Sequence, residues 1–488
     1  MIPSVSERRQ YYANPAIRKR LADFLGGEPP DHTTAVFFSP GTEWESGYRS
    51  PHPFTDWAEW LDLGAELNRS LWDTQSLVAH LDIEYVNFDF PAHPYLAAER
   101  IFACQQPVVG AVQSLLAECG IAPLHLLTGR GHHFVWRMDR STPAFARLRG
   151  LGWMANSLRR LYAYHRGPVG ETVPPDFGAA FSGLGLVMEY LAQRVKVLSA
   201  PECSLPVELA AIEAGGGRRG REVIAVDITE YADPLSTRVI RMPFSVYLKP
   251  WQQRYLLGDP TLAALEPIFL IPLQGISLRE GLTIRRDSQA VQELAARVST
   301  AIPDASEGME SLIQTYRQSA LARFHTWFHS QDHDAESDWP ATYDQTPFAM
   351  LPPCAGHILT VPNDLLLRPG CVERVVRVLL SLGWHPRHIA GLIRSKYEHD
   401  HSWGRQWTDS DPATRADFYA RVFTGAFVTG VDDLVDFNCQ SAREEGLCFV
   451  ENCRENLAPF RTSLIHRKHY ERLGCRPFNR LFLSTEHS

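Results

Sequence analysis

The chain has 488 residues, of which 44% are hydrophobic and 21% are charged, and its net charge is -8. This composition is typical of globular proteins with room for two to four domains, and an acidic balance gives no global basic surface, so contact with nucleic acid must come from local patches. Nine cysteines without a secretion signal argue against a disulfide scaffold and leave metal binding or ordinary burial.

The N-terminus, MIPSVSERRQYY, lacks the apolar stretch of a signal peptide. The most apolar later stretch, PTLAALEPIFLIPL, is interrupted by Glu266 and three prolines, which excludes a membrane-spanning helix. We therefore expect a cytoplasmic protein without a membrane partner.

Periodicity divides the chain into parts. Between about residues 75 and 250, short apolar runs alternate with longer segments of helical period, whereas strand signals thin out after about residue 290. We predict an α+β fold made of a mixed domain, a helical linker and a mainly helical domain that contains cysteines. The expected bounds are 1–290, 291–347 and 348–488.

The first chemical pattern is a pair of acids in AHLDIEYVNFD, within a predicted strand. Because alternate side chains of a strand share a face, Asp82 and Glu84 project together, about 6 to 7 Å apart along the chain. Two carboxylates on one face favour a divalent cation. The alternative is an edge strand whose polar face is solvated.

The second pattern is HLLTGRGHHFVW, in which a glycine-containing turn joins two predicted strands. We expect the glycines to supply positive φ and to let a phosphate approach the backbone amides. Thr128 and Arg130 would add a hydroxyl and a forked cation. Alternation puts His132 and His133 on opposite faces, so one imidazole faces the site. The alternative is a hairpin with a buried or solvent-facing histidine.

The third pattern combines EVIAVD, an apolar strand that ends at Asp227, with RMPFSVYLK. Pro243 favours extended backbone, and in a strand Arg241, Ser245 and Lys249 share one face because they are four residues apart. Two cations and a hydroxyl on one face suit a triphosphate. The alternative is an edge strand protected by charges.

In this order, the three segments resemble the catalytic core of the archaeo-eukaryotic primase superfamily, with its motifs hhhDhE, sGxGxHh, a strand ending in Asp, and RxPxSxHxK. The counterparts are LDIE, TGRGHH, AVD and RMPFSVYLK. Thr128 keeps the hydroxyl of the usual Ser, whereas Tyr247 stands where many members have His. The resemblance covers roughly residues 10–275.

The resemblance implies a site for nucleotidyl transfer. Asp82, Glu84 and Asp227 would hold two Mg²⁺ or Mn²⁺ ions that activate a primer 3′-hydroxyl and neutralise a triphosphate, and His133 would be a further catalytic residue. The nucleotide-binding residues that it implies are Thr128, Gly129, Arg130, Gly131, Arg241, Ser245 and Lys249.

Four later cysteines have the spacing C-x84-C-x8-C-x4-C, which differs from a zinc ribbon. An apolar helical stripe at residues 372, 375, 376, 379 and 380 begins to fill the long gap compactly. A PPC, a helical insertion and three clustered cysteines resemble the C-terminal iron-sulfur domain of the primase large subunit. By that resemblance Cys354, Cys439, Cys448 and Cys453 ligate a 4Fe-4S cluster; the alternatives are Zn²⁺ and buried cysteines without a ligand.

Two local segments are basic. The loop arginines Arg218, Arg219 and Arg221 are expected to be solvated, with template phosphates as the alternative. Residues 454–480 contain seven Arg or Lys against two Glu, with aromatic side chains interleaved. This composition fits binding of a template or a primer 5′ end, and equally a charged helix surface.

These patterns predict a primase-polymerase that makes or extends short primers on single-stranded DNA from NTPs or dNTPs. A primer-dependent repair or gap-filling polymerase, a nucleic-acid-binding or nucleotide-sensing module, and a two-metal phosphoesterase are the alternatives. No P-loop signature GxxxxGK[ST] occurs, so we expect unwinding to come from a helicase or another replication or repair protein.

Overall fold

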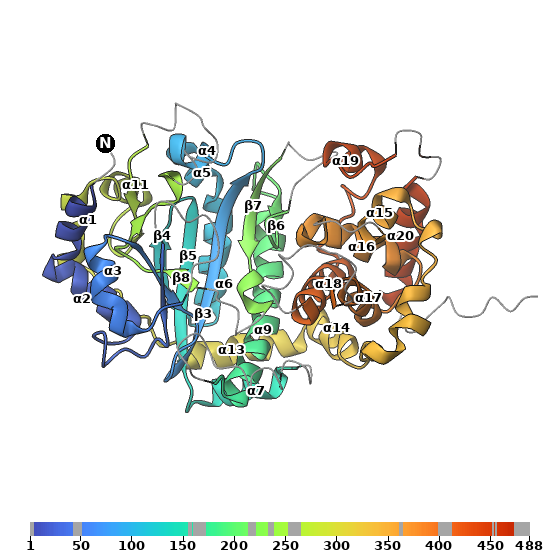
Figure 1. Cartoon of the computed structure of the whole chain (residues 1–488), viewed down its shortest axis with the longest axis horizontal. Helices are drawn as coiled ribbons and strands as arrows, with labels where there is room; N and C mark the ends of the chain where they lie inside the picture. The colour runs from blue at the N-terminus through green and yellow to red at the C-terminus, as the bar shows by residue number, and fades with distance from the viewer. Residues whose placement is uncertain are drawn as a thin grey trace, which may run out of the picture. The chain divides into compact units, whose positions relative to one another are not determined.

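The computed structural model describes residues 4–41, 51–154, 159, 172–212, 221–232, 239–251, 265–360, 365–398, 412–450, 453 and 456–472 (Figure 1). The chain divides into two compact units. The first is Met1–Leu191, Leu198–Val207 and Ile224–Gln314, and the second is Ala192–Val197, Glu208–Val223 and Thr315–Ser488.

The first unit is built on a six-stranded sheet with the order β11-β4-β5-β3-β7-β6. Its strands are β3 (Ser76–Asn87), β4 (Leu124–Leu127), β5 (Gly131–Asp139), β6 (Val207–Glu208), β7 (Glu222–Asp227) and β11 (Ile271–Pro272). Strands β4, β5, β3 and β7 run side by side in Figure 1. The long pair β3 and β5 is antiparallel and forms the centre of the sheet.

Two smaller sheets complete the strands. One has the order β1-β2-β8 and the other pairs β10 with β9. Their bounds are β1 (Phe38–Gly41), β2 (Glu66–Ser70), β8 (Val239–Arg241), β9 (Val246–Tyr247) and β10 (Ile268–Phe269).

Helices surround these sheets, and two of them, Pro175–Ser199 and Ser306–Gln318, include residues that belong to the second unit. They are α1 (Val5–Tyr12), α2 (Pro15–Leu25), α3 (Trp57–Asp62), α4 (His93–Leu96), α5 (Ala98–Cys104), α6 (Gln106–Glu118), α7 (Pro143–Leu151), α9 (Pro175–Ser199), α11 (Leu278–Ile284), α12 (Ser288–Arg297) and α13 (Ser306–Gln318). The N-cap of α2 is Asn14, which accepts from the amide of Ala16, and Pro15 occupies the first turn, where no amide donor is needed.

The second unit is helical. Its helices are α14 (Ala320–Phe328), α15 (Pro353–Thr360), α16 (Pro369–Ser381), α17 (Pro386–Glu398), α18 (Pro412–Thr429), α19 (Cys439–Glu444) and α20 (Ala458–Arg472). The expected apolar stripe of α16 is confirmed, because the side chains at 372, 375, 376, 379 and 380 are all buried. Within the described ranges, no named strand follows β11.

The predicted α+β class is confirmed in this form, a mixed fold with a central sheet and many helices. In the described part of the chain, no helix has both the length and the apolar character that a bilayer crossing requires.

The expectation of one extended strand across RMPFSVYLK is wrong. Strand β8 ends at Arg241, and the amide of Ser245 donates to the carbonyl of Met242 at 3.2 Å, which closes a turn. Pro243 and Phe244 occupy its centre, and Phe244 has a φ of 64°. Proline followed by positive φ is the geometry of a type II turn. Arg241 and Lys249 therefore reach the site from opposite sides of a turn.

Candidate functional site: carboxylates and cations beside the central strands

Strand β3 carries two carboxylates on one face, as the alternation predicts. Leu81, Ile83 and their odd-numbered neighbours are fully buried on the other face. The side chains of Asp82 and Glu84 are 14% and 12% exposed, so both carboxylates are largely buried from solvent. This confirms the shared face and excludes a fully solvated edge.

His133 is the histidine that faces these carboxylates. It lies opposite Asp82 in the β3–β5 register, and its Nε2 atom is 3.5 Å from Oδ1 of Asp82. His132 points to the other face, where its Nδ1 lies 2.9 Å from Nε2 of His125. Burial and the cation of Arg241 lower the pKa of His133 to about 3, so the imidazole is neutral at physiological pH.

The turn between β4 and β5 is closed by its own groups. The amide of Thr128 donates to the carbonyl of Gly131 at 2.9 Å, and the amide of Gly131 donates to the Thr128 hydroxyl at 3.1 Å. The hydroxyl of Thr128, expected to bind phosphate, is therefore buried and stabilises the turn.

The two glycines of the turn are required for space. Neither Gly129 nor Gly131 has positive φ, so that expectation is wrong. A Cβ atom at Gly129 would overlap the ring of Tyr247, and one at Gly131 would overlap the carbonyl oxygen of Ile83. Close approach of a side chain and of a neighbouring strand explains both glycines.

Arg130 projects from this turn to Glu84 and forms an ion pair with it. Its carbonyl accepts from the amide of Tyr85 at 3.1 Å and from Nε2 of Gln105 at 2.9 Å, which fixes the backbone. Burial alone would raise the pKa of Glu84, but Arg130, Lys249 and Arg241 lower it to about 2. Glu84 is thus surrounded by cations.

Asp227 ends strand β7, which neighbours β3 in the sheet. Its Oδ1 accepts from the amide of Thr229 at 2.9 Å. Burial and the charges of Glu84 and Asp227 raise the pKa of Asp82 well above its usual value. The three predicted acids therefore lie close enough to repel one another.

The cations of RMPFSVYLK gather around the same acids, although the backbone turns between them. Arg241 donates through Nε to Oε1 of the fully buried Glu66 at 2.7 Å. Burial and the charge of Arg130 lower the pKa of Lys249 to about 7, while Glu84 acts in the opposite direction. Arg130, Arg241 and Lys249 thus form one cationic cluster.

Ser245 does not join this cluster. It is fully buried, and its hydroxyl accepts from the amide of Leu67 at 2.7 Å and donates to the carbonyl of Val246 at 3.1 Å. The structure gives Ser245 a role in holding the turn to strand β2, in place of the predicted contact with a nucleotide.

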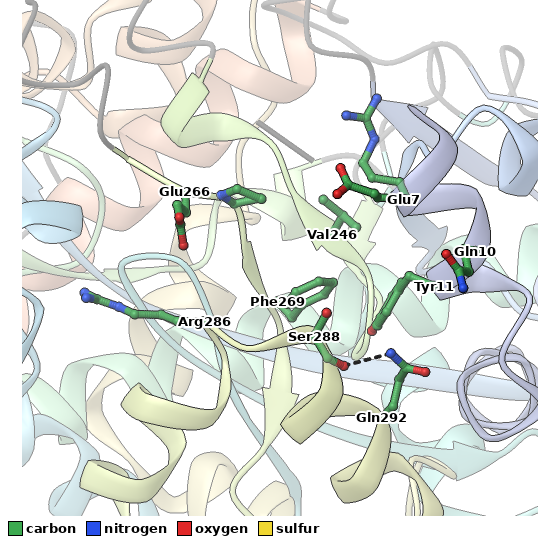
Figure 2. Close-up of a pocket in the computed structure, with 11 residues that line it drawn as sticks. Glu7, Gln10, Tyr11, Val246, Glu266, Phe269, Arg286, Ser288 and Gln292 are labelled. Carbon is green, nitrogen blue, oxygen red and sulfur yellow. Dashed lines mark hydrogen bonds between the residues drawn. The ribbon is translucent and has the colours of Figure 1, made fainter. Parts of the chain in front are cut away.

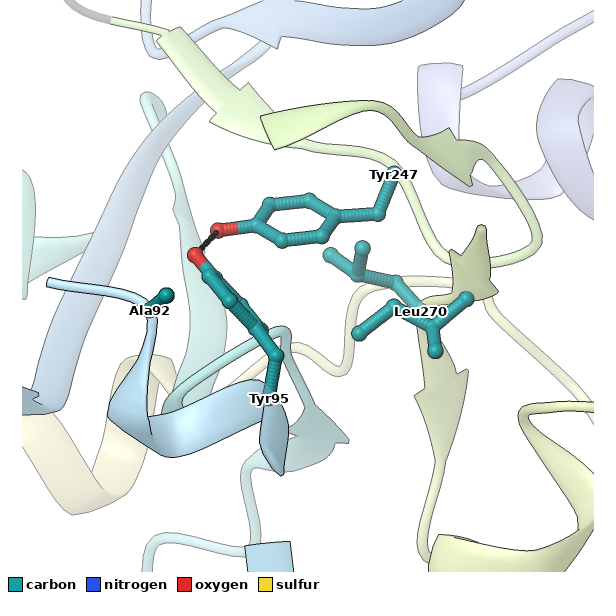
Figure 3. Close-up of a cluster of buried hydrophobic side chains, with 5 residues drawn as sticks. Ala92, Tyr95, Tyr247 and Leu270 are labelled. Carbon is teal, nitrogen blue, oxygen red and sulfur yellow. Dashed lines mark hydrogen bonds between the residues drawn. The ribbon is translucent and has the colours of Figure 1, made fainter. Parts of the chain in front are cut away.

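Two tyrosines, Tyr95 and Tyr247, lie beside the cationic cluster. Tyr95 was not among the residues predicted from the sequence. The hydroxyls of Tyr95 and Tyr247 are 3.1 Å apart (Figure 3). Both rings belong to a buried cluster with Ala92, Ile268 and Leu270. The guanidinium of Arg241 lies 4.7 Å from the centroid of the Tyr247 ring, so Tyr247 holds the cation through its face.

A second buried layer lies behind the carboxylates and was also missed. His80, two residues before Asp82, has Nδ1 3.1 Å from Oε1 of Glu230, and its ring packs edge to face on His133 at 4.4 Å. Tyr231 donates through its hydroxyl to the carbonyl of His80 at 2.6 Å. The segment that follows Asp227 is thereby fixed to strand β3.

The acids have a donor set that suits a hard divalent cation. Oδ1 of Asp82 is buried, and no hydrogen-bond donor among the described residues reaches it. A cation would relieve the repulsion that raises the pKa of Asp82. In the part of the chain that the structure describes, however, no three His, Cys, Asp or Glu side chains are arranged as a preformed metal site. The carboxylate of Glu84 is directed to Arg130, which is one reason why the three acids are not arranged as a metal site.

A separate pocket of about 430 Å³ lies beside the β9–β10 pair (Figure 2). Val246 and Phe269 line it, whereas Tyr247 and Ile268 belong to the tyrosine cluster. Tyr11 packs on Phe269 with ring centroids 4.5 Å apart. None of the predicted site residues lines this pocket.

The predicted cluster cysteines are only partly brought together. Cys354 and Cys439 interact electrostatically beside Arg374, and burial raises the pKa of Cys354. Cys448 and Cys453 are exposed. Since no set of three potential metal ligands occurs among the described residues, the thiols do not form a preassembled site, and the cluster stays a prediction from the resemblance.

The basic segments are described in part. Arg218 and Arg219 lie outside the described residues, as do residues 473–488, whereas Arg221 precedes strand β7. Helix α20 carries the first part of the basic tail, and Arg467 donates through Nε to the carbonyl of Ser381 at 3.0 Å. At that position a basic side chain packs on the protein.

Comparison with known proteins adds little. No family profile and no curated protein matches the chain. Among solved structures, the polymerase domain of ligase D from Mycobacterium tuberculosis, in complex with DNA, matches with a TM-score of 0.28 and 16% identity, over 61% of this chain and 93% of that chain. A likeness of this size is too weak to define either the fold or the function.

Proposed function

We propose that the chain is a template-directed nucleotidyltransferase of the primase-polymerase type, which joins nucleoside triphosphates into short primers on single-stranded DNA. One observation carries the proposal. Asp82, Glu84 and Asp227 converge with Arg130, Arg241 and Lys249 in a partly buried site at the centre of the first unit. Phosphoryl transfer requires carboxylates that can hold divalent metal ions and, beside them, basic side chains that can bind phosphates.

The acids would hold the divalent ions. Asp82 offers the buried oxygen without a donor, and Asp227 and Glu84 supply the neighbouring charge. Bound Mg²⁺ or Mn²⁺ would supply Lewis acidity for the 3′-hydroxyl and charge neutralisation for the triphosphate. If Glu84 binds a metal ion, it would give up its ion pair with Arg130, and Arg130 would then be available to bind an anion.

The cationic cluster would bind the triphosphate. Arg241 is held in place by its hydrogen bond to Glu66 and by its contact with the ring of Tyr247, so its position is fixed before substrate binds. The pKa of Lys249 is about 7, so the side chain is about half protonated at neutral pH, and a phosphate bound beside it would favour the protonated form. His133 remains neutral and is available to donate one hydrogen bond without adding charge.

A primer-synthesis assay tests the proposal. Purified protein is incubated with Mg²⁺ or Mn²⁺, unprimed single-stranded DNA and labelled NTPs or dNTPs. The test variant is Asp82→Ala with Glu84→Ala. Its control is Glu59→Ala with Asp62→Ala, which removes two exposed acids from helix α3 with the same change of charge.

New products that vanish only in the test variant support the proposal. Extension of a supplied primer without initiation indicates the repair or gap-filling polymerase. Release of phosphate without incorporation indicates a phosphoesterase. Template binding with no turnover of nucleotide indicates a binding module and overturns the catalytic proposal. Duplex template with and without an added helicase shows whether such a partner is required.

The cysteine prediction has its own test. Anaerobically purified protein is analysed for iron, acid-labile sulfide and zinc, together with the variant Cys354→Ser and the control Cys119→Ser in the first unit. About four iron and four sulfide per chain, lost in the Cys354 variant, support the cluster. A chain that contains neither iron nor zinc overturns it.

A further inference from the structure

Arg285 is a fully buried cation directly behind the turn that joins β4 and β5. It follows helix α11 as the C-cap residue and is 1% exposed. Its Nη1 donates to the carbonyl of Thr128, and its guanidinium lies 4.8 Å from the ring centroid of Phe102. Its own carbonyl accepts from the amide of Phe269 at 2.9 Å, so the position is fixed from three sides.

The surroundings of Arg285 do not compensate its charge. Within the described residues no carboxylate pairs with it, and its Nε is buried without a hydrogen-bond partner. Burial and the nearby Arg286 lower the pKa of Arg285 to about 9, so it remains charged at neutral pH. A buried cation without an anion is costly, and folded proteins rarely keep one without a use.

Two other fully buried arginines show the usual arrangement. Arg69 pairs with Asp73 through Nη2 at 2.8 Å and donates to two carbonyls. Arg387 pairs with Asp417 in the second unit. Each buried guanidinium has an acid within contact, which Arg285 lacks. The charge of Arg285 is therefore uncompensated, and an anion bound at the turn that Arg285 contacts would compensate it.

We propose that Arg285 is a positioning residue that adapts the Thr128–Gly131 turn for the phosphates of a bound polyphosphate. It holds the Thr128 carbonyl from behind and adds a fixed positive charge on the buried side of the turn. Arg130 projects from the same turn, and Tyr247, whose ring contacts Arg241, is also close enough to Arg285 to act on its charge. The inference rests on the proposed triphosphate site and adds a residue outside its predicted motifs.

The test uses the full-length protein and three variants. Arg285→Gln keeps a donor for the Thr128 carbonyl and removes the charge, Arg285→Lys keeps the charge, and Arg69→Gln is the matched control at a buried, paired arginine. Affinity for inorganic tripolyphosphate is measured by calorimetry, and the unfolding midpoint is measured without ligand. Where the wild type extends a primer, KM for the nucleotide and kcat are compared.

We expect Arg285→Gln to bind tripolyphosphate about tenfold more weakly, to raise KM by a similar factor and to leave kcat nearly unchanged. Its unfolding midpoint should equal or exceed that of the wild type, because an uncompensated charge is removed. Arg285→Lys should restore most of the affinity. Arg69→Gln should lower the midpoint and leave the affinity unchanged.

Two outcomes overturn the inference. One is equal affinity for tripolyphosphate in wild type and Arg285→Gln, and the other is no binding in the wild type. If tripolyphosphate binds through Arg285 but no nucleotide is incorporated on any template, the anion site stands and the proposed polymerase function fails. Incorporation with a KM that does not depend on Arg285 leaves the proposed function and removes the inference.

Discussion

Nε2 of His133 lies 3.5 Å from Oδ1 of Asp82, yet the two side chains do not form an ordinary ion pair. The pKa of His133 is lowered to about 3 by burial and by Arg241, so the imidazole carries no charge at neutral pH. The charge of Asp82 is consequently opposed by burial, Glu84 and Asp227, while Arg130 and Arg241, but not His133, act in the opposite direction.

This relationship predicts that Asp82→Asn stabilises the protein in the absence of metal. Removal of a carboxylate whose charge is disfavoured by burial and by two neighbouring acids should raise the free energy of unfolding by roughly 1 kcal/mol, while nucleotide incorporation is lost. Mn²⁺ should raise the unfolding midpoint of the wild type and not that of the variant. Calorimetry with and without Mn²⁺ checks both effects.

The double variant Glu59→Ala with Asp62→Ala serves as the control and should keep the response to Mn²⁺. A destabilised Asp82→Asn protein that still responds to Mn²⁺ would mean that Asp82 is a structural residue and that the cation binds elsewhere.

Gly129 and Tyr247 form a second testable pair. A Cβ atom at Gly129 would overlap the Tyr247 ring, so Gly129→Ala should destabilise the protein by roughly 1 to 3 kcal/mol and reduce nucleotide incorporation. In the Tyr247→Ala background, the same substitution should cost less than about 1 kcal/mol, because the space is then open. A double-mutant cycle of unfolding free energies measures this coupling.

Gly131 is the matched comparison, since its Cβ atom would meet the main-chain oxygen of Ile83. Gly131→Ala should be equally harmful whether or not Tyr247 is present. Additive costs for Gly129 and Tyr247 would contradict the packing that we describe.

The shared face of Asp82 and Glu84 could be predicted because a long strand with strict alternation fixes which side chains share a face. Alternation also predicted that one of His132 and His133 faces the site, and the resemblance selected His133. The turn at Phe244 could not, because a buried phenylalanine with positive φ follows from tertiary contacts. The hydroxyl of Tyr11 donates to the carbonyl of Phe244 at 2.8 Å and helps to hold that conformation. Residues that act through partners distant in sequence carry no local signal.

Glu66 and Arg285 are further examples. Glu66 belongs to strand β2, in a segment without a recognisable motif, and only its contact with Arg241 reveals its part in the site. Arg285 is the C-cap residue of an ordinary helix, where a basic side chain is expected from the helix dipole alone. Their roles follow from burial and from the partners that the fold gives them.

Lys249 predicts a pH dependence of nucleotide use. Burial and Arg130 lower its pKa to about 7, so it is protonated below pH 7 and loses its charge as the pH rises. The contribution of Lys249 to kcat/KM should therefore fall about tenfold between pH 6 and pH 8. Arg241 and Arg130 stay charged throughout.

The variant Lys249→Arg isolates this effect, since its guanidinium keeps its charge over the same range. The ratio of kcat/KM in the variant to that in the wild type should rise from pH 6 to pH 8. A ratio that does not change with pH would show that Lys249 is not the titrating phosphate ligand.

The last prediction concerns acid stability in the second unit. Asp417 accepts from Nε2 of His333 at 2.8 Å and pairs with the buried Arg387. Burial acts to raise the pKa of Asp417, but His333 and Arg387 outweigh it and lower the pKa below its usual 3.8. The stabilisation is therefore complete above about pH 4 and is lost as the pH falls through the lowered pKa.

Asp417→Asn leaves Arg387 with only the exposed Asp332 as an acidic partner and should cost about 3 to 5 kcal/mol at pH 7. The difference in unfolding free energy from the wild type should shrink toward pH 2, because below the usual pKa of 3.8 Asp417 takes up a proton in the unfolded chain while the folded chain resists it. Asp338→Asn, an exposed acid of the same unit, should change the stability by less than about 0.5 kcal/mol. A difference for Asp417→Asn that is constant from pH 7 to pH 2 would show that the side chain acts by packing and that its ionisation does not contribute.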